Sequence, residues 1–222
     1  DSRSEDWIKN GRQGAFEVNN FTSPAFVARV NYHGVKGLRV GASFYYNQTA
    51  KNGTKPWRNT GYKFPVTIVT GDLQYKGFNN NLIVRGNAVY GNLGASGALT
   101  TINNSSSAAS GYPNTTVAQN AVSYGGEAGY NIGSFFHSKA PRIYPFIRYE
   151  YYNPMEKTEA NTGLLADKRF QVSAVTAGLN YYALPNLVIK ADYTHRSIGG
   201  GKYNDENLVS VGIAYIGWFI KK

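Results

Sequence analysis

The chain has 222 residues, among them 25 glycines and 18 tyrosines but a single methionine and no cysteine, which excludes disulfides and any cysteine-based metal site or nucleophile. No stretch approaches the roughly 18 apolar residues of a membrane helix, and no basic-then-apolar signal peptide opens the sequence, so we interpret it as a mature or trimmed form. The formal charge of +10 fits nucleic acid, an acidic surface or anionic solutes as partners, and the positions of the charges must decide among them.

Nine segments alternate polar and apolar side chains with a period of two, the pattern of a strand with one apolar face. In chain order they are Ala25–His33, Leu38–Gln48, Pro65–Lys76, Leu82–Leu93, Ser123–Ile132, Ile143–Tyr152, Gln171–Tyr182, Leu187–Arg196 and Leu208–Ile220. Strands of soluble domains average about 5–6 residues, whereas a tilted strand needs about 9–11 to cross a bilayer. The lengths therefore favour membrane-spanning strands.

The connections between these segments alternate in length. Three are tight, namely Gly34–Gly37, Gly77–Asn81 and Ala183–Asn186, and Gly133–Arg142 is intermediate where a short turn is due. The others are long and polar, namely Thr49–Phe64, Gly94–Val122, Asn153–Phe170 and Ser197–Asn207, and we expect Gly94–Val122 to be a mobile surface loop. Outer-membrane barrels have short periplasmic turns and long external loops, so the alternation predicts that topology, with Lys221 and Lys222 on the periplasmic side.

Aromatic residues recur near the ends of the more apolar face of each segment. Downward segments end in Tyr32, Tyr75, Tyr130, Tyr181 and Phe219, and upward segments in Tyr46, Tyr90, Tyr151 and Tyr193. Small apolar residues such as Val30, Ala88 and Val211 occupy the middle. An apolar belt between two rings of amphipathic side chains is what a barrel wall shows to lipid. We therefore predict an all-β fold, an antiparallel transmembrane β-barrel or part of one, in contact with the lipid and lipopolysaccharide of a bacterial outer membrane; a soluble barrel or sandwich is the alternative.

The opposite faces carry charges in mid-strand, which a dry core would reject without partners and a wet lumen accepts. Seven are basic, Arg29, Arg39, Lys76, Arg85, Arg148, Lys190 and Arg196, and four are acidic, Asp72, Glu127, Glu150 and Asp192. We interpret Arg29, Arg39, Arg85, Arg148, Lys190 and Arg196 as an electropositive path for anions. The alternative is that these residues are structural and pair with the four carboxylates across neighbouring strands. Arg148 with Glu150 and Lys190 with Asp192, each two residues apart on one face, are also candidates for mutual neutralisation.

Nine is an unusual count, because bacterial single-chain barrels normally have an even number of strands. Either Gly14–Phe21, which alternates weakly, supplies a tenth strand, or strands before Asp1 are missing, and we favour the second. We treat residues 1–222 as one domain, with 1–24 an N-terminal segment or partial strand and 25–222 the barrel strands.

Several of the predicted strands are similar in sequence to those of a known protein family. The stretches are Ala28–Tyr32, Gly37–Tyr46, Glu127–Asn131, Pro145–Asn153, Ala177–Tyr182 and Asn186–Tyr193, of which Pro145–Glu150 and Val188–Tyr193 are the least generic. The chain resembles, in its C-terminal portion, Bacteroidota-type outer-membrane porins related to the phosphate-selective porin family. The resemblance implies a longer barrel of about sixteen strands, completed as a homotrimer or with another chain, whose basic lumen favours small anionic solutes. No anion ladder matches residue by residue, so phosphate selectivity is not carried over.

Catalytic and metal-binding patterns are weak in this sequence. His33, His137 and His195 are scattered, and Gly199–Lys202 lacks the strand, the helix and the Ser or Thr of a phosphate-binding loop. The basic residues are dispersed rather than gathered on one nucleic-acid-binding surface. We therefore expect no enzyme, metal, cofactor or nucleic-acid partner, but a porin for passive diffusion that favours anions. The alternatives are a non-catalytic barrel subunit or scaffold of an outer-membrane complex and, third, a soluble ligand-binding barrel.

Overall fold

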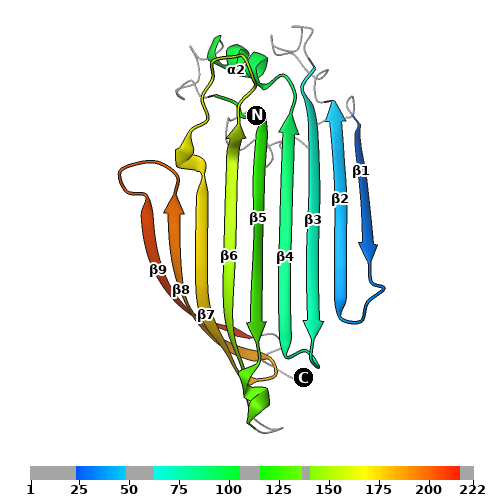
Figure 1. Cartoon of the computed structure of the whole chain (residues 1–222), viewed down its shortest axis with the longest axis vertical. Helices are drawn as coiled ribbons and strands as arrows, with labels where there is room; N and C mark the ends of the chain where they lie inside the picture. Colours follow the sequence, from blue (N-terminus) through cyan, green and yellow to red (C-terminus); the bar gives the residue numbers. More distant parts are fainter. Residues whose placement is uncertain (1–23, 49–62, 106–115, 137–140, 216–222) are drawn as a thin grey trace, which may run out of the picture.

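The structure is a computed structural model that describes residues 24–48, 63–105, 116–136 and 141–215. Within these residues, nine strands follow one another in chain order in a single sheet (Figure 1). They are β1 (Ala25–Tyr32), β2 (Leu38–Gln48), β3 (Pro65–Gly77), β4 (Leu82–Leu93), β5 (Asn120–Tyr130), β6 (Arg142–Lys157), β7 (Val172–Leu184), β8 (Leu187–Ile198) and β9 (Asp205–Tyr215). Every neighbouring pair is antiparallel. The all-β fold and the nine predicted strands are confirmed.

Several strand ends differ from the prediction. Strand β6 continues to Lys157, five residues past the predicted end, and β5 begins at Asn120 rather than at Ser123. The two extensions belong together, because Asn120 pairs with Lys157 beyond a register shift in the β5–β6 ladder. An irregularity of this kind interrupts the period-two pattern, so alternation alone cannot follow the strand through it. The predicted end of the last strand, Ile220, lies outside the described residues.

The connections separate the two ends of the sheet. Residues 33–37, 78–81, 131–141 and 185–186 join strands at one end, here called the turn end, and residues 49–64, 94–119, 158–171 and 199–204 at the other, the loop end. The β8–β9 connection is shorter than predicted, because β8 extends to Ile198 and β9 begins at Asp205. Arg196 and Glu206 form an ion pair of 2.7 Å across this hairpin. The paired part of the hairpin therefore includes Glu206, which was predicted to lie in a loop.

Tight turns at the turn end require particular residues. Gly37 has a φ of 79°, and a Cβ there would collide with the carbonyl oxygen of Lys76 near the end of β3. Glycine adopts this left-handed conformation without a steric penalty. The β3–β4 turn instead places Phe78, Asn79 and Asn80 at φ values of 50°, 56° and 66°. Asparagine tolerates that region better than most residues, which explains the pair at this turn.

The stretch Gly94–Val122 contains more structure than the predicted loop. It holds the helix α2 (Ser96–Ser105), at the loop end of the sheet (Figure 1). Leu99 of α2 is buried with Phe64, Leu93, Val117 and Ala121 in one apolar cluster. Burial of Leu99, not helix propensity, holds this short helix in place, because isolated helices of this length are marginal in water. Two short 3-10 helices, η3 (Ile132–Phe135) and η4 (Lys168–Phe170), lie in other connections.

The sheet is open within the described residues. Strand β1 pairs there with β2 alone and β9 with β8 alone. Because the number of strands between them is odd and each pair is antiparallel, β1 and β9 run in the same direction. Barrel closure, the single-domain assignment and the possible tenth strand remain predictions, and Gly14–Phe21 lies outside the described residues.

Candidate functional site

The cross-strand register gives the whole sheet two distinct faces. Side chains that face each other in neighbouring strands share a face, so the phase of one strand fixes the phase of the next. One row of register partners runs Arg39, Gln74, Arg85, Glu127, Arg148, Thr176 and Thr194, from β2 to β8. This row belongs to the polar face. Val30, Ala42, Gly71 and Ala88 are likewise register partners, from β1 to β4, and belong to the apolar face.

The polar face carries more charge than the sequence prediction gave it. Its basic residues in the strands are Arg29, Arg39, Lys76, Arg85, Arg142, Arg148, Lys190 and Arg196, and its acidic residues are Asp72, Glu127, Glu150, Asp192 and Glu206. Arg142 and Glu206 are additions, because the predicted strands stopped short of them. Residues 205–209, Asp-Glu-Asn-Leu-Val, do not alternate polar and apolar side chains, so the period-two pattern contains no signal that could have placed Glu206 in a strand. All six predicted anion-path residues lie on this face, although their role as a path stays a prediction.

Arg29, Arg39 and Asp72 form the first of two charged triads. Asp72 on β3 contacts Arg29 on β1 at 2.7 Å and Arg39 on β2 at 3.7 Å. Arg29 also donates to the hydroxyl of Ser43 at 2.9 Å. Its guanidinium crosses β2 above Gly41, where any side chain would collide with it. A missing side chain on the intervening strand therefore allows a pair between strands that are not neighbours.

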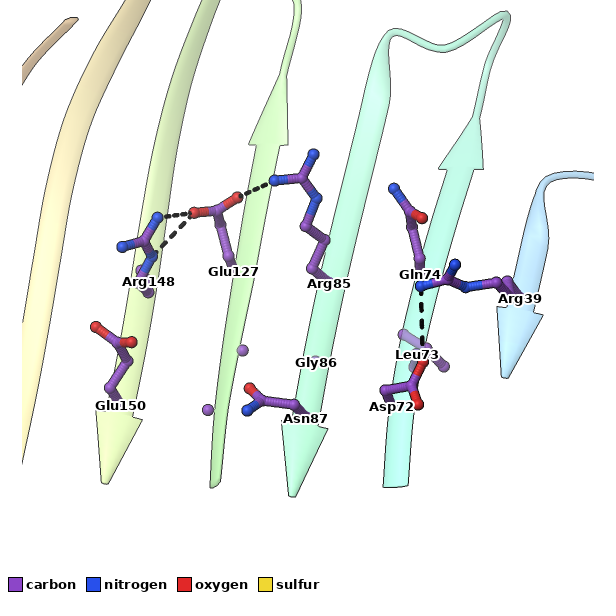
Figure 2. A pocket seen from close by; sticks show the side chains of 12 residues that line it. Arg39, Asp72, Leu73, Gln74, Arg85, Gly86, Asn87, Glu127, Arg148 and Glu150 are labelled. Atoms are coloured by element: carbon purple, nitrogen blue, oxygen red, sulfur yellow. Dashed lines mark hydrogen bonds and ion pairs between the residues drawn. The ribbon is translucent and has the colours of Figure 1, made fainter. Parts of the chain in front are cut away.

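Arg85, Glu127 and Arg148 form the second triad, on β4, β5 and β6. Glu127 lies 3.6 Å from Arg85 and 2.5 Å from Arg148, and its register partners are these same two arginines (Figure 2). In each triad one carboxylate serves two guanidinium groups, so each triad keeps a net charge of +1. The arginine side chains remain 42–58% exposed. Pairs this exposed stabilise the fold by only about 0–1 kcal/mol each. Their larger effect is to fix where the positive groups lie.

The alternative of structural pairing with Asp72 and Glu127 is confirmed, whereas the two pairings suggested by spacing along one strand are wrong. Arg148 contacts Glu127 across the strand pair, and in the described part of the chain Glu150, Lys190 and Asp192 form no ion pair. The reason is geometric, because residues two apart on one strand are farther apart than direct cross-strand neighbours. Arg196 pairs with Glu206 and also donates to the Tyr152 hydroxyl at 3.1 Å. Five of the six predicted anion-path residues therefore have carboxylate partners, whereas Lys190 has none within the described residues.

The polar face is hollowed in mid-sheet, and two of its depressions contain most of the charged groups. One depression of about 390 Å³ lies over β2–β6 and contains Arg39, Asp72, Arg85 and Arg148 (Figure 2). A second, of about 510 Å³, lies over β4–β8 and is lined by Phe146, Lys190 and Asp192 among others. Charged groups of both signs thus line concave, solvent-open surface. Such a surface can bind and release small polar solutes without burying a charge.

Helix α2 covers the polar face at its loop end. Val66 and Leu93 are register partners on this face, and Ala121 occupies the same phase on β5. All three pack with Leu99 of α2. Glu159, from the β6–β7 connection, accepts a hydrogen bond of 2.5 Å from the Gly97 amide at the start of α2. A carboxylate there also complements the positive end of the helix dipole. The β4–β5 connection therefore folds over the polar face.

The apolar face exposes its side chains to the surroundings. Val30 is 71% exposed, Ile147 58% and Val211 77%. Soluble monomers rarely expose a contiguous apolar surface across a whole sheet. None of the helices in the described part of the chain is long and apolar enough to span a bilayer.

Most of the predicted girdle tyrosines on the apolar face contact residues nearer the end of the sheet than themselves. At the loop end, the hydroxyls of Tyr46, Tyr90, Tyr151 and Tyr193 are hydrogen-bonded to Gln48, Asn120, Glu156 and Asn207 respectively. At the turn end, the ring of Tyr32 lies against Gly34 and that of Tyr75 against Gly77. Tyr130 stacks on Phe135 with 5.4 Å between ring centroids, and Tyr181 is the register partner of Ile189. The rings thus incline away from the middle of the face. Phe219 lies outside the described residues.

The histidines lie apart from the charged triads. His33 follows β1 at the turn end, and His195 occupies the apolar-face phase of β8, 3.0 Å from Asn207. His137 lies outside the described residues. Among the residues that the structure does describe, no three histidine or carboxylate side chains gather as metal ligands.

No model of a known protein family matches this chain, and no curated protein matches it either. The family resemblance in the strands stays a prediction. A function has to be argued from the two faces of the sheet and from the side chains that they carry.

Proposed function

We propose that this chain forms part of the wall of an outer-membrane porin, through which small solutes diffuse passively with a preference for anions. One observation carries the proposal. The same strands that present an exposed apolar face, with tyrosine hydroxyls bonded at its loop end, present a concave charged face on the other side. Lipid on one side and water on the other satisfies both faces at once.

The dimensions of the strands support a membrane location. Strands β2–β9 have 11–16 residues. At about 3.3 Å per residue and a tilt of about 45°, 9–11 residues advance about 21–26 Å along the membrane normal, which matches the apolar band of about 25 Å in outer-membrane barrels. In water, exposed residues such as Val211 and Ile213 would cost free energy or drive association. In lipid they cost nothing, which explains why the apolar face has no second layer packed on it in the described structure.

An anion preference follows from the charge balance of the polar face. Eight basic residues and five acidic residues leave an excess of three positive charges on that face of the described strands. Each guanidinium has five N–H donors, more than one carboxylate can accept, so the paired arginines still have donors for a passing anion. Because the excess is small, we expect a mild preference rather than strict selectivity.

The open edges favour a second candidate function. Within the described residues no strand pairs with the outer edges of β1 and β9. In a membrane such edges need partners, because lipid offers no hydrogen bonds. A partial wall completed by another chain, or by further copies, would serve as a subunit or scaffold of an outer-membrane complex. Such a protein on its own would form no stable channel.

Planar-bilayer recording separates the two functions. The purified protein is expected to give stable conductance. In a salt gradient, the sign of its reversal potential should show that anions pass more readily than cations. Arg85→Glu should move that potential toward the cation side more than Lys51→Glu, which lies in the long β2–β3 connection. Equal shifts for the two variants would contradict the assignment of Arg85 to the pore. Membrane insertion without any conductance would favour the scaffold instead.

A further inference from the structure

The second depression of the polar face contains an apolar ring among charged side chains. Phe146 belongs to the same phase as Arg148 and Glu150 on β6, and it lies half-buried in the wall of the 510 Å³ depression. A phenylalanine facing water in mid-strand loses the free energy that burial would give it. The local arrangement shows what makes room for it.

Glycines flank Phe146 on both neighbouring strands. Its register partners are Gly129 on β5 and Gly178 on β7. A Cβ at Gly178 would lie 2.6 Å from Cε1 and 2.7 Å from Cζ of the ring, so the ring rests directly on the bare backbone of β7. Part of the ring is thereby covered, and Phe146 also lines the depression. An apolar platform results in the middle of a polar wall.

Polar groups of both signs surround this platform, and three of them have no hydrogen-bonded or ion-paired partner among the described residues. In the described part of the chain, Glu150, Lys190 and Asp192 make no hydrogen bond or ion pair through their side chains. All three line the same depression as Phe146. The Arg148 guanidinium lies 5.8 Å from the ring centroid. Hydrogen-bond donors and acceptors are therefore available around one apolar surface.

The charges that line the depression are balanced. Arg85, Arg148 and Lys190 are basic, and Glu127, Glu150 and Asp192 are acidic. A balanced set does not favour a charged solute over a neutral one, but it can hydrogen-bond hydroxyl groups, which both donate and accept. The volume of about 510 Å³ falls in the range of small-molecule sites, about 300–1,000 Å³.

We infer that this depression is a weak binding subsite for a sugar ring. The apolar C–H face of the sugar packs on Phe146, and its hydroxyls bond to Asp192 and Glu150 as acceptors and to Lys190 and Arg148 as donors. The inference deepens the proposed function and rests on it, because a solute reaches the depression only if the polar face lines a water-filled path. It adds a class of neutral solutes to the anions that the overall charge favours.

Current block in planar bilayers tests the inference. Maltotriose is expected to reduce the conductance of the wild-type channel in a saturable way, and glycerol, which has hydroxyls but no ring, is not. Phe146→Ala should raise the half-blocking concentration of maltotriose about tenfold, because roughly 50 Å² of apolar contact is lost. Phe146→Trp should restore the block, which a purely structural role of the ring would not predict.

A matched control comes from another aromatic residue on the same face. Tyr45 on β2 is half-buried, occupies the polar-face phase and does not line this depression. Tyr45→Ala should leave the maltotriose block unchanged. Asp192→Asn should weaken the block severalfold, because a charged acceptor becomes a neutral one.

The outcomes separate the inference from the proposed function. A channel that conducts but shows no maltotriose block, or is blocked by benzoate and not by sugars, overturns the sugar subsite and leaves the pore intact. If no channel forms, the heat of maltotriose binding to the detergent-solubilised protein is measured by calorimetric titration. Binding heat in the wild type that disappears in Phe146→Ala supports the sugar subsite but not the pore. No binding heat in the wild type, together with no channel, overturns both the subsite and the pore.

Discussion

Arg29 on β1 and Asp72 on β3 form an ion pair of 2.7 Å although strand β2 lies between them. The pair exists because Gly41, on β2, leaves the space above its backbone empty for the guanidinium of Arg29. Three strands are thus tied together through the absence of one side chain. Neither the alternation pattern nor the spacing of charges in the sequence contains this relationship.

Gly41→Val should uncouple Arg29 from Asp72. We expect a coupling energy between Arg29 and Asp72 of about 0.5–1 kcal/mol in the wild-type background. It is measured by a double-mutant cycle, from thermal unfolding in detergent of Arg29→Ala, Asp72→Ala and the double variant. In the Gly41→Val background the same cycle should give a coupling near zero, because the valine side chain blocks the guanidinium. A coupling that persists in that background would show that Arg29 reaches Asp72 by another route.

Glu127→Gln should increase anion preference. Glu127 neutralises one charge between Arg85 and Arg148, so its removal leaves two half-exposed guanidinium groups without a counter-charge. Reversal potentials in a salt gradient should therefore shift further to the anion side. Asp167→Asn removes the same charge from the β6–β7 connection, outside both triads, and is the control. Similar shifts in both variants would argue that overall charge, not the triad, sets selectivity.

Leu99→Ala should loosen helix α2 from the polar face. Leu99 is buried in the apolar cluster at the loop end, and replacing a buried leucine by alanine costs about 2–5 kcal/mol. If α2 narrows a pore mouth, single-channel conductance should rise and become noisier. Thr101→Ala changes an exposed position of the same helix and should have no such effect. Unchanged conductance in Leu99→Ala would place α2 outside the solute path.

The strands and their faces were predictable because a strand with one polar and one apolar face repeats the same two environments along its length. Alternation in Leu38–Gln48 or Leu187–Arg196 therefore identified both the strand and the apolar side, which carries Tyr46 or Tyr193. Cross-strand partners were not predictable, because they depend on register. Arg148 pairs with Glu127, 21 residues away, and not with Glu150 on its own strand. Register follows from turn geometry, which composition does not determine.

Helix α2 was missed although its sequence contains a signal. Ala95, Ala98, Leu99 and Ile102 follow the spacing of three and four residues that places apolar side chains on one side of a helix, and all of them belong to the apolar cluster or pack against it. The many Ser, Asn and Thr residues around them have low helix propensity and are typical of loops. Packing on Leu93 and Val117 outweighs that local preference.

Acidification should weaken the turn at η4. The Asp167 carboxylate accepts hydrogen bonds from the side chain and the backbone amide of Arg169, and these bonds lower the pKa of Asp167 below its usual value. A lowered folded-state pKa means that the stabilisation is present above the unfolded value of about 3.9 and is lost as the pH falls through the folded value. Hydrogen exchange at the Arg169 amide, corrected for its intrinsic rate, should lose protection below about pH 4. Asp167→Ala, which removes the accepting oxygens, should show the same low protection at every pH.

Lysine substitutions at two adjacent positions of β9 test which face meets lipid. Val211 belongs to the apolar face and is 77% exposed, and Ser210 is its neighbour on the polar face. In a water-soluble sheet, Val211→Lys would be tolerated at so exposed a site. In a membrane it should cost about 2–4 kcal/mol near the midplane, whereas Ser210→Lys should cost little. Folding into lipid vesicles, followed by urea titration, measures both variants on one scale. If Val211→Lys folds as stably as Ser210→Lys, the apolar face does not meet lipid and the porin proposal fails with it.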